Sequence, residues 1–423
     1  MNKPQLKTAL VLSATAALTL ALYPLHVRAA EKKTPTVSPA FGKPLKAAQE
    51  ELKSGRYSEA LAELDKARAL PKPTAWDTHI INELSLYAYA KTKDFPAAAK
   101  TMEALVNDGQ TDPAEVNRDI RELANIFYQL KDYGKAIDYG NRAIRVGSAD
   151  ATTNLVVAQS YYLKGDYKGT QHFTDNLVNT EIKQGETPKE MQLQLILSSC
   201  VKLGDQPCVT HSLERLVTYY PKPEYWENLV GSLFQSRQAA ASDVDILNIY
   251  RLADDVGAVN KPQQYLEMAQ LALEQGSPGD AEHVLEQGYA KNVFTEQRDR
   301  EKAQRVLALA KKRAASDQAS LSKQAADAQA AATGEQDVGV GIAYLGYQQY
   351  DKAADALAQG LMKGGVKDQA QARLLLGIAQ LKAGKKDQAV KTFHAVSGDP
   401  TLVRLANLWT LRARSAVGTV ARN

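Results

Sequence analysis

An internal repeat limits what this chain can fold into more than any other feature of the sequence. Segments that begin at Gly55, Lys131, Gly165 and Gln348 superimpose on one another without gaps. Each has an aromatic residue two positions after a turn residue and a small residue three positions further on. Self-similarity at such a period is typical of stacked structural repeats. The aligned aromatic positions are Tyr57, Phe95, Tyr133, Tyr167 and Tyr350, with weaker equivalents at Gln206, Pro278 and Lys386.

The spacing of these positions predicts where further repeats lie. Successive intervals are 38, 38, 34, 39, 72, 72 and 36 residues, so each interval of 72 is twice 36. We therefore expect one more helix pair around Tyr225–Asp255 and another around Gln297–Thr333. The alanine- and glutamine-rich stretch Ala314–Thr333 fits the repeat poorly and is compatible with a long helix or a linker.

Small residues recur at one position in each half of the repeat. Two helices that pack closely need a small side chain where their backbones approach, and alanine also has the best helix propensity. The second half carries Ala60, Ala98, Ala136, Ala281, Ala353 and Ala389 at this position, with Thr170 as an exception. The first half carries Ala48, Ala124, Ala158, Ala269, Gly341 and Gly377.

This pattern resembles the tetratricopeptide repeat, in which a helix, a tight turn and a second antiparallel helix form a unit of about 34 residues. The resemblance implies an all-α, right-handed superhelical solenoid of about ten helix pairs, here with a capping helix over Leu402–Ser415. The predicted plan is a signal peptide at 1–29, a flexible lead-in at 30–43, the N-terminal part of the solenoid at 44–293, a divergent helix pair or linker at 294–333, C-terminal repeats with the capping helix at 334–416, and a tail at 417–423.

The first thirty residues have the pattern of a secretory signal. Lys3 and Lys7 precede the almost uncharged, apolar run Thr8–Tyr23, and Val27 and Ala29 stand at the −3 and −1 positions of a cleavage site. We expect cleavage after Ala29, a periplasmic protein and no stable membrane insertion after cleavage. An uncleaved anchor is the alternative, although the run is shorter than the roughly 20 residues of a membrane span.

Charge and motifs argue against nucleic-acid binding and catalysis. The 52 basic and 48 acidic residues leave a net charge of +4 and form no concentrated basic face. The sequence has no HExxH, GxSxG or P-loop motif, and the glycines around Gly341 do not follow the GxGxxG spacing. We therefore expect a non-catalytic protein without a cofactor or a metal ion.

Cys200 and Cys208 are the only cysteines, and neither lies where a lipoprotein signal would need one. In the repeat register they lie on opposite sides of the turn Lys202–Pro207, where a disulfide is plausible in an oxidising compartment. Two buried small residues are the alternative interpretation. A metal site with His211 is a third, although it lacks a fourth ligand.

The inner surface is the remaining candidate for function. In tetratricopeptide arrays the first helix of each pair lines a concave groove that binds an extended peptide or a partner helix. Extending the register outward places six residues on that side, against the alternative of an ordinary solvated face. The candidate partner-binding residues are Arg118, Arg121, Glu122, Asn125, Tyr128 and Tyr162.

The segment YYPKPEYWENL from Tyr219 to Leu229 resembles periplasmic tetratricopeptide proteins that accompany TonB–ExbB–ExbD systems in Gram-negative bacteria. Further similarity covers residues 280–288, 346–368 and 372–393. The resemblance implies an accessory of TonB-dependent uptake of iron complexes, with a TonB, ExbB or ExbD component as partner. Scaffolds for envelope assembly or polysaccharide export, and accessories of peptidoglycan enzymes, are the alternatives. The family-like residues are Tyr219, Tyr220, Pro221, Tyr225 and Trp226.

Overall fold

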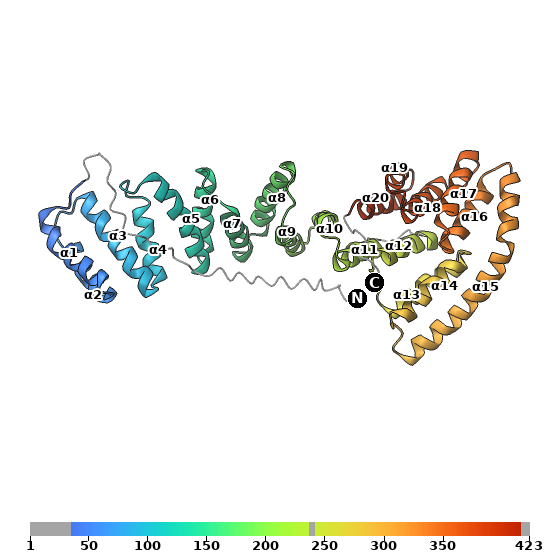
Figure 1. Cartoon of the computed structure of the whole chain (residues 1–423), viewed down its shortest axis with the longest axis horizontal. Coiled ribbons are helices and arrows are strands. Elements are labelled where there is room, and N and C mark those ends of the chain that lie inside the picture. Colours follow the sequence, from blue (N-terminus) through green and yellow to red (C-terminus); the bar gives the residue numbers. More distant parts are fainter. Residues whose placement is uncertain (1–34, 237–241, 416–423) are drawn as a thin grey trace. The chain divides into compact units, whose positions relative to one another are not determined.

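A computed structural model describes residues 35–236 and 242–415, and every regular element within these ranges is an α-helix (Figure 1). The expected signal peptide at 1–29 and the tail at 417–423 lie outside the described residues. Among the described helices, none combines the length and the apolar character that a bilayer crossing requires. The chain forms two compact units, an N-terminal unit of residues 35–186 with 198–204 and a C-terminal unit of residues 187–197 with 205–415.

The N-terminal unit consists of four antiparallel helix pairs. The pairs are α1 (Pro39–Lys53) with α2 (Tyr57–Arg68), α3 (Ala75–Thr92) with α4 (Phe95–Leu105), α5 (Pro113–Gln129) with α6 (Tyr133–Arg145), and α7 (Ala151–Leu163) with α8 (Tyr167–Lys183). We call the first helix of each pair helix A and the second helix B.

Helix α9 (Glu190–Leu203) contributes residues to both units. The rest of the C-terminal unit is α10 (Gln206–Tyr219), α11 (Pro223–Ser236), α12 (Asp243–Asp255), α13 (Pro262–Glu274), α14 (Pro278–Ala290), α15 (Gln297–Ala330), α16 (Glu335–Gly346), α17 (Tyr350–Lys363), α18 (Gln369–Lys382), α19 (Lys386–His394) and α20 (Pro400–Arg414).

The repeat found in the sequence fixes where helix B begins. All eight aligned positions, from Tyr57 to Lys386, are the first residue of a helix. An aspartate precedes four of them and caps the helix, because its carboxylate accepts a hydrogen bond from the backbone N–H three residues later. These caps are Asp94, Asp132, Asp166 and Asp205.

The small residues lie where the two helices of a pair touch. Each alanine at the helix-B position is fully buried. At Gly341 an added Cβ would lie 2.6 Å from Leu357 Cγ, and at Gly377 it would lie 2.4 Å from Phe393 Cε1. Gly341 therefore serves helix packing, as the repeat register predicts.

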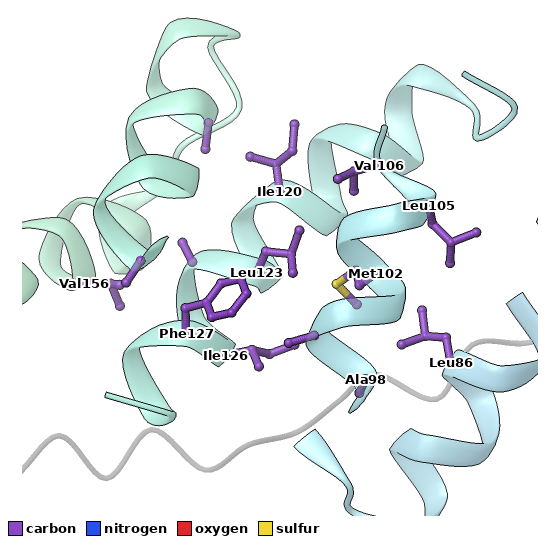
Figure 2. Close-up of a cluster of buried hydrophobic side chains, with 14 residues drawn as sticks. Leu86, Ala98, Met102, Leu105, Val106, Ile120, Leu123, Ile126, Phe127 and Val156 are labelled. Atoms are coloured by element: carbon purple, nitrogen blue, oxygen red, sulfur yellow. The ribbon is translucent and has the colours of Figure 1, made fainter. Parts of the chain in front are cut away.

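The core of the N-terminal unit fills the space between successive helix pairs. Figure 2 shows one continuous cluster to which α3, α4, α5, α6 and α7 all contribute. Met102 and Leu123, both fully buried, lie near its centre. A second cluster joins α1, α2 and α3 around Phe41 and Leu64. Each pair is thus stabilised by its neighbours along the chain, as in other repeat arrays.

The C-terminal unit closes on itself through its last helix. Helix α20 contacts α18 and α19, which precede it, and also α10 and α12 from the beginning of the unit (Figure 1). A large share of its residues is therefore buried: Leu402, Leu405, Ala406, Leu408, Trp409, Thr410 and Ala413. The sequence predicts a capping helix over Leu402–Ser415, and α20 lies at this place. It also packs on helices that lie far from it in sequence, which the repeat pattern does not predict.

Two predicted boundaries also change. The sequence predicts a flexible lead-in at 30–43. Instead, helix α1 begins at Pro39, within this segment, and the side chain of Phe41 is buried. The divergent segment 294–333 is neither a helix pair nor a linker but mostly the single helix α15. Its buried residues, four alanines and one leucine, lie one or two turns apart and form an apolar seam: Ala303, Ala310, Ala314, Leu321 and Ala328.

Candidate functional site

Five of the six candidate binding residues lie along one side of α5. Positions 118, 121, 122, 125 and 128 follow the three- and four-residue spacing of a helix face. Arg118 is exposed, and the other four are half-buried. The residues between them, including Ile120, Leu123 and Phe127, are buried in the core. We call the five positions the α5 face.

Four of the six candidates are engaged within the protein. Arg118 Nε donates a 3.2 Å hydrogen bond to Asp119 Oδ1. The Arg121 guanidinium donates a hydrogen bond of 2.8 Å to the carbonyl oxygen of Ser148, in the turn before α7. The Tyr128 ring lies 6.1 Å from the ring of Tyr133, the first residue of α6. The last two contacts link helices of the array, so Arg121 and Tyr128 have a structural role.

Tyr162 is engaged in the same way one repeat later. Its ring lies 5.3 Å from the ring of Tyr167, and its hydroxyl shares a 2.7 Å hydrogen bond with Ser198 Oγ. A tyrosine at this position of helix A therefore packs on the aromatic residue that begins helix B. Tyr162 lies on α7 and is therefore not part of the helix face that the other five candidates share on α5.

The two remaining polar groups of the α5 face have no hydrogen-bond partner among the described residues. They are the carboxyl of Glu122 and the side-chain amide of Asn125. Burial raises the pKa of Glu122, and the neighbouring carboxylate of Asp119 adds to this effect, while Arg118 opposes it. Neither group is fully shielded from solvent, so each can bond to water in the free protein and to a ligand in a complex. Glu122 and Asn125 are thus the side chains of this face best prepared for recognition.

The family-like segment serves packing. Tyr225 and Trp226 are almost completely buried. The Tyr225 hydroxyl bonds to Glu190 and Gln194 of α9, and its pKa is raised by burial and by the Glu190 carboxylate. Tyr220 donates a 2.7 Å hydrogen bond to the carbonyl oxygen of Pro188.

Tyr219 and Pro221, the other two family-like residues, are half-buried. The five family-like residues therefore offer little exposed surface to a partner, whereas Lys222, Pro223, Glu224 and Glu227 of the same segment are exposed.

Both cysteines are disulfide-bonded in this structure. Cys200 is fully buried near the end of α9, and Cys208 lies in the first turn of α10. No group of His, Cys, Asp or Glu side chains in the described part of the chain could hold a metal ion.

A charged cluster that the sequence does not predict lies at the closure of the C-terminal unit. Asp255, at the end of α12, pairs with Lys382 of α18, and its other oxygen accepts a 2.7 Å hydrogen bond from Arg412 Nε of α20. We call these three residues the closure triad. A carboxylate at a helix C-terminus is unfavourable for the helix dipole, which is the one sequence signal that could have indicated nearby cations.

Next to the triad, burial shifts the pKa values of two titratable groups in the direction that favours their neutral forms. Burial raises the pKa of Asp254, and its Oδ1 has no hydrogen-bond partner. Burial lowers the pKa of His283, whose two ring nitrogens face the side-chain amides of Gln287 and Gln348. A neutral imidazole can donate to one amide and accept from the other, so the pair of glutamines suits the uncharged form.

Comparison with known proteins supports the repeat assignment over part of the chain. Residues 341–400 match the tetratricopeptide repeat family model. A search of curated proteins finds no match to the sequence.

Several solved structures are similar to the chain. The complex of the TPR2AB domain of yeast Sti1 with pHSP90 shows 14% identity and a TM-score of 0.31 over 64% of this chain and 98% of the other. The pilF protein of Pseudomonas aeruginosa shows 17% identity and a TM-score of 0.24 over 47% of this chain and 98% of the other. The TPR domain of P58(IPK) shows 10% identity and a TM-score of 0.23 over 89% and 99%. Scores this low carry no argument about function.

Proposed function

We propose that this chain, with a tetratricopeptide repeat at 341–400 and the same paired helices elsewhere, is a scaffold that binds a protein partner through the α5 face. The observation that carries the proposal is the pair of unpartnered groups at Glu122 and Asn125. An asparagine amide can donate to and accept from a peptide backbone, and a carboxylate can bind a cationic side chain. Arg118 beside them can interact with an acidic group.

The partner that we propose is a component of a TonB–ExbB–ExbD system in the periplasm. The resemblance of the Tyr219–Leu229 segment and of the last repeats to such accessory proteins supports this assignment. It would place the scaffold beside TonB-dependent uptake of iron complexes. The buried positions of Tyr225 and Trp226 mean that the support comes from family likeness and not from an exposed binding surface.

The test is binding of the purified mature chain to soluble segments of TonB and ExbD by isothermal titration calorimetry. We expect Glu122→Lys combined with Asn125→Ala to weaken binding about tenfold, because both polar contacts are lost. Glu59→Lys is the matched control, since Glu59 is an exposed acid on helix B of the same unit. Binding that is absent, or that the two variants weaken equally, would overturn the proposal.

Export is tested separately from binding. A periplasmic protein cleaved after Ala29 has Ala30 as its first residue and shows no free thiol when it is denatured without reductant. N-terminal sequencing and thiol titration of the protein from fractionated cells measure both. An intact Met1 together with two free thiols would contradict export.

A further inference from the structure

Helix α15 is one long helix at a position where the 72-residue interval in the sequence predicts a helix pair. At 34 residues it spans about 51 Å, at 1.5 Å per residue. It contacts α13, α14 and α16, and no other described helix (Figure 1). Its buried seam at Ala303, Ala310 and Ala314 faces these neighbours. The opposite side of its first half is therefore left to solvent.

That opposite side carries a regular row of basic residues. Arg298, Lys302, Arg305, Leu309 and Lys312 follow each other at alternating intervals of four and three residues. This is the spacing of one face of a helix that packs against another helix. All five are exposed, and Leu309 has 42% of its surface accessible. We call these five residues the α15 stripe, which is about 21 Å long.

The cations of the stripe differ from the other cations of this half-helix. Lys311 pairs with Glu286 at 2.7 Å, Arg313 donates to the carbonyl oxygen of Leu273, and Arg300 donates to two carbonyl oxygens near the helix start. The four cations of the stripe have no hydrogen bond or ion pair within the described residues. Two acids flank them: Glu301 accepts a hydrogen bond from Gln297, and Asp299 accepts one from Gln263 of α13.

We infer that the α15 stripe is a second docking surface, and that its occupant is an acidic amphipathic helix of a partner protein. Such a helix would lie along the side of α15 that α13, α14 and α16 leave uncovered. Acidic side chains at the same alternating spacing would face the four cations, and one apolar side chain would cover Leu309. Complementary charge would set the orientation of the partner and speed its association. The surface is independent of the α5 face.

The probe is a fluorescent helical peptide of about 18 residues with glutamates at three- and four-residue spacing and one central leucine, measured by anisotropy with the full mature chain. We expect saturable, salt-sensitive binding. Arg298→Glu, Lys302→Glu, Arg305→Glu and Lys312→Glu together should weaken it at least about tenfold, and Leu309→Ser about threefold. A photo-crosslinker on the central residue of the peptide should label residues 298–312.

Matched control variants distinguish a specific effect of the α15 stripe from an effect of net charge. Four exposed lysines of the N-terminal unit, changed together to glutamate, alter the net charge equally and should change binding less than about twofold. The α5-face variant Glu122→Lys should also leave it unchanged, so this proposal and the proposed function can fail separately. The control lysines are Lys43, Lys46, Lys53 and Lys100.

Four results would overturn the inference. The peptide binds no better than its lysine-substituted version, the control lysines matter as much as the stripe, or the crosslinks fall outside α15. Vesicles of phosphatidylcholine with phosphatidylglycerol provide a fourth comparison. Stripe-dependent binding to these vesicles without binding to the peptide would assign the surface to membranes and reject the helical partner.

Discussion

The same repeat builds an open array in one unit and a closed one in the other. In the N-terminal unit, α1 to α7 contact only helices one or two places away in sequence. In the C-terminal unit, α20 returns to α10 and α12, and Arg404 of α20 reaches Ser232 of α11. An open array is held by nearest-neighbour interfaces alone, whereas closure adds contacts between its ends.

The difference also divides the two proposed surfaces. The open unit keeps unpartnered polar groups on a helix-A face, at Glu122 and Asn125. The closed unit covers its ends with α20 and leaves its unpartnered surface on α15, where one long helix replaces a pair. Closure should make the C-terminal unit unfold as a whole, and the N-terminal unit should lose its outermost pair first.

The largest effect should come from removing the anchor of α20. Trp409 is fully buried and stacks on Phe393 with 6.2 Å between ring centres. We expect Trp409→Ala to destabilise the C-terminal unit by about 3–5 kcal/mol. Hydrogen exchange should accelerate in α10 and α12 as well as in α19 and α20.

The control is Trp409→Phe, because the indole Nε1 of Trp409 has no hydrogen-bond partner and the ring contact is kept. This variant should cost far less than the alanine variant. Faster exchange in α19 and α20 alone, with α10 and α12 unchanged, would show that closure does not couple the ends of the unit.

The closure triad should give the next largest effect. Asp255→Asn leaves Lys382 and Arg412 without their common carboxylate, and Asp255 itself is only 7% exposed. We expect Asp255→Asn to lower the free energy of unfolding by about 2–3 kcal/mol. This loss is smaller than for a fully buried ion pair, because the two cations are partly exposed. Urea unfolding followed by tryptophan fluorescence measures it.

The exposed ion pair of Lys385 and Asp351 provides the comparison for this variant. Asp351→Asn should cost less than about 0.5 kcal/mol. Equal losses from Asp255→Asn and Asp351→Asn would mean that the triad contributes nothing special to closure.

How far the sequence predicts this molecule depends on whether the information is local. The repeat register places the first residue of eight helices and the close helix contacts at Gly341 and Gly377 correctly, because caps, turns and small residues act within one pair. The closure by α20 could not be predicted, since no sequence period relates Arg412 to Asp255, which are 157 positions apart.

The candidate site shows the same limit. The register places the α5 residues on one helix face, but it cannot show that Tyr128 and Tyr162 are engaged by the aromatic residues of helix B. The α15 segment shows another limit. The 72-residue interval suggests a helix pair there, whereas residues 297–330 form one helix.

Acidification should destabilise the first two pairs of the open unit. Burial alone would raise the pKa of Asp77, but its carboxylate accepts four hydrogen bonds of 2.7–2.9 Å from Ser38 and Thr74. These bonds outweigh burial and lower the pKa from 3.8 to about 2. Because the folded pKa lies below the unfolded one, the stabilisation is present above about pH 4 and is lost as the pH falls toward 2. It amounts to about 2 kcal/mol at neutral pH.

Hydrogen exchange of α1 and α3 between pH 5 and pH 3, corrected for intrinsic rates, measures this loss. In Asp77→Asn the two helices should already be less protected at pH 7, and the additional acid effect should disappear. If the acid effect persists unchanged in Asp77→Asn, other carboxylates cause it and the prediction is wrong.

The smallest predicted effect has the opposite pH dependence and lies in the same pair of helices. His79 is buried on the ring of Trp76, and burial alone would lower its pKa. Its hydrogen bonds to Glu83 and Asp108 outweigh burial, so the pKa is raised above 6.5. A raised folded pKa gives stability that is complete below the unfolded value and is lost as the pH rises through the folded one.

We expect protonated His79 to contribute less than about 1 kcal/mol to the free energy of unfolding, because Glu83 is exposed and its interaction with the ring is screened by solvent. His79→Gln should remove the decline in stability of α3 and α4 above neutral pH while leaving the acid effect of Asp77 in place. Nuclear magnetic resonance titration of the His79 ring protons measures the pKa directly, and a value below 6.5 would contradict the prediction. Because no comparable histidine takes part in the closure triad, alkaline conditions should loosen the open unit before the closed one.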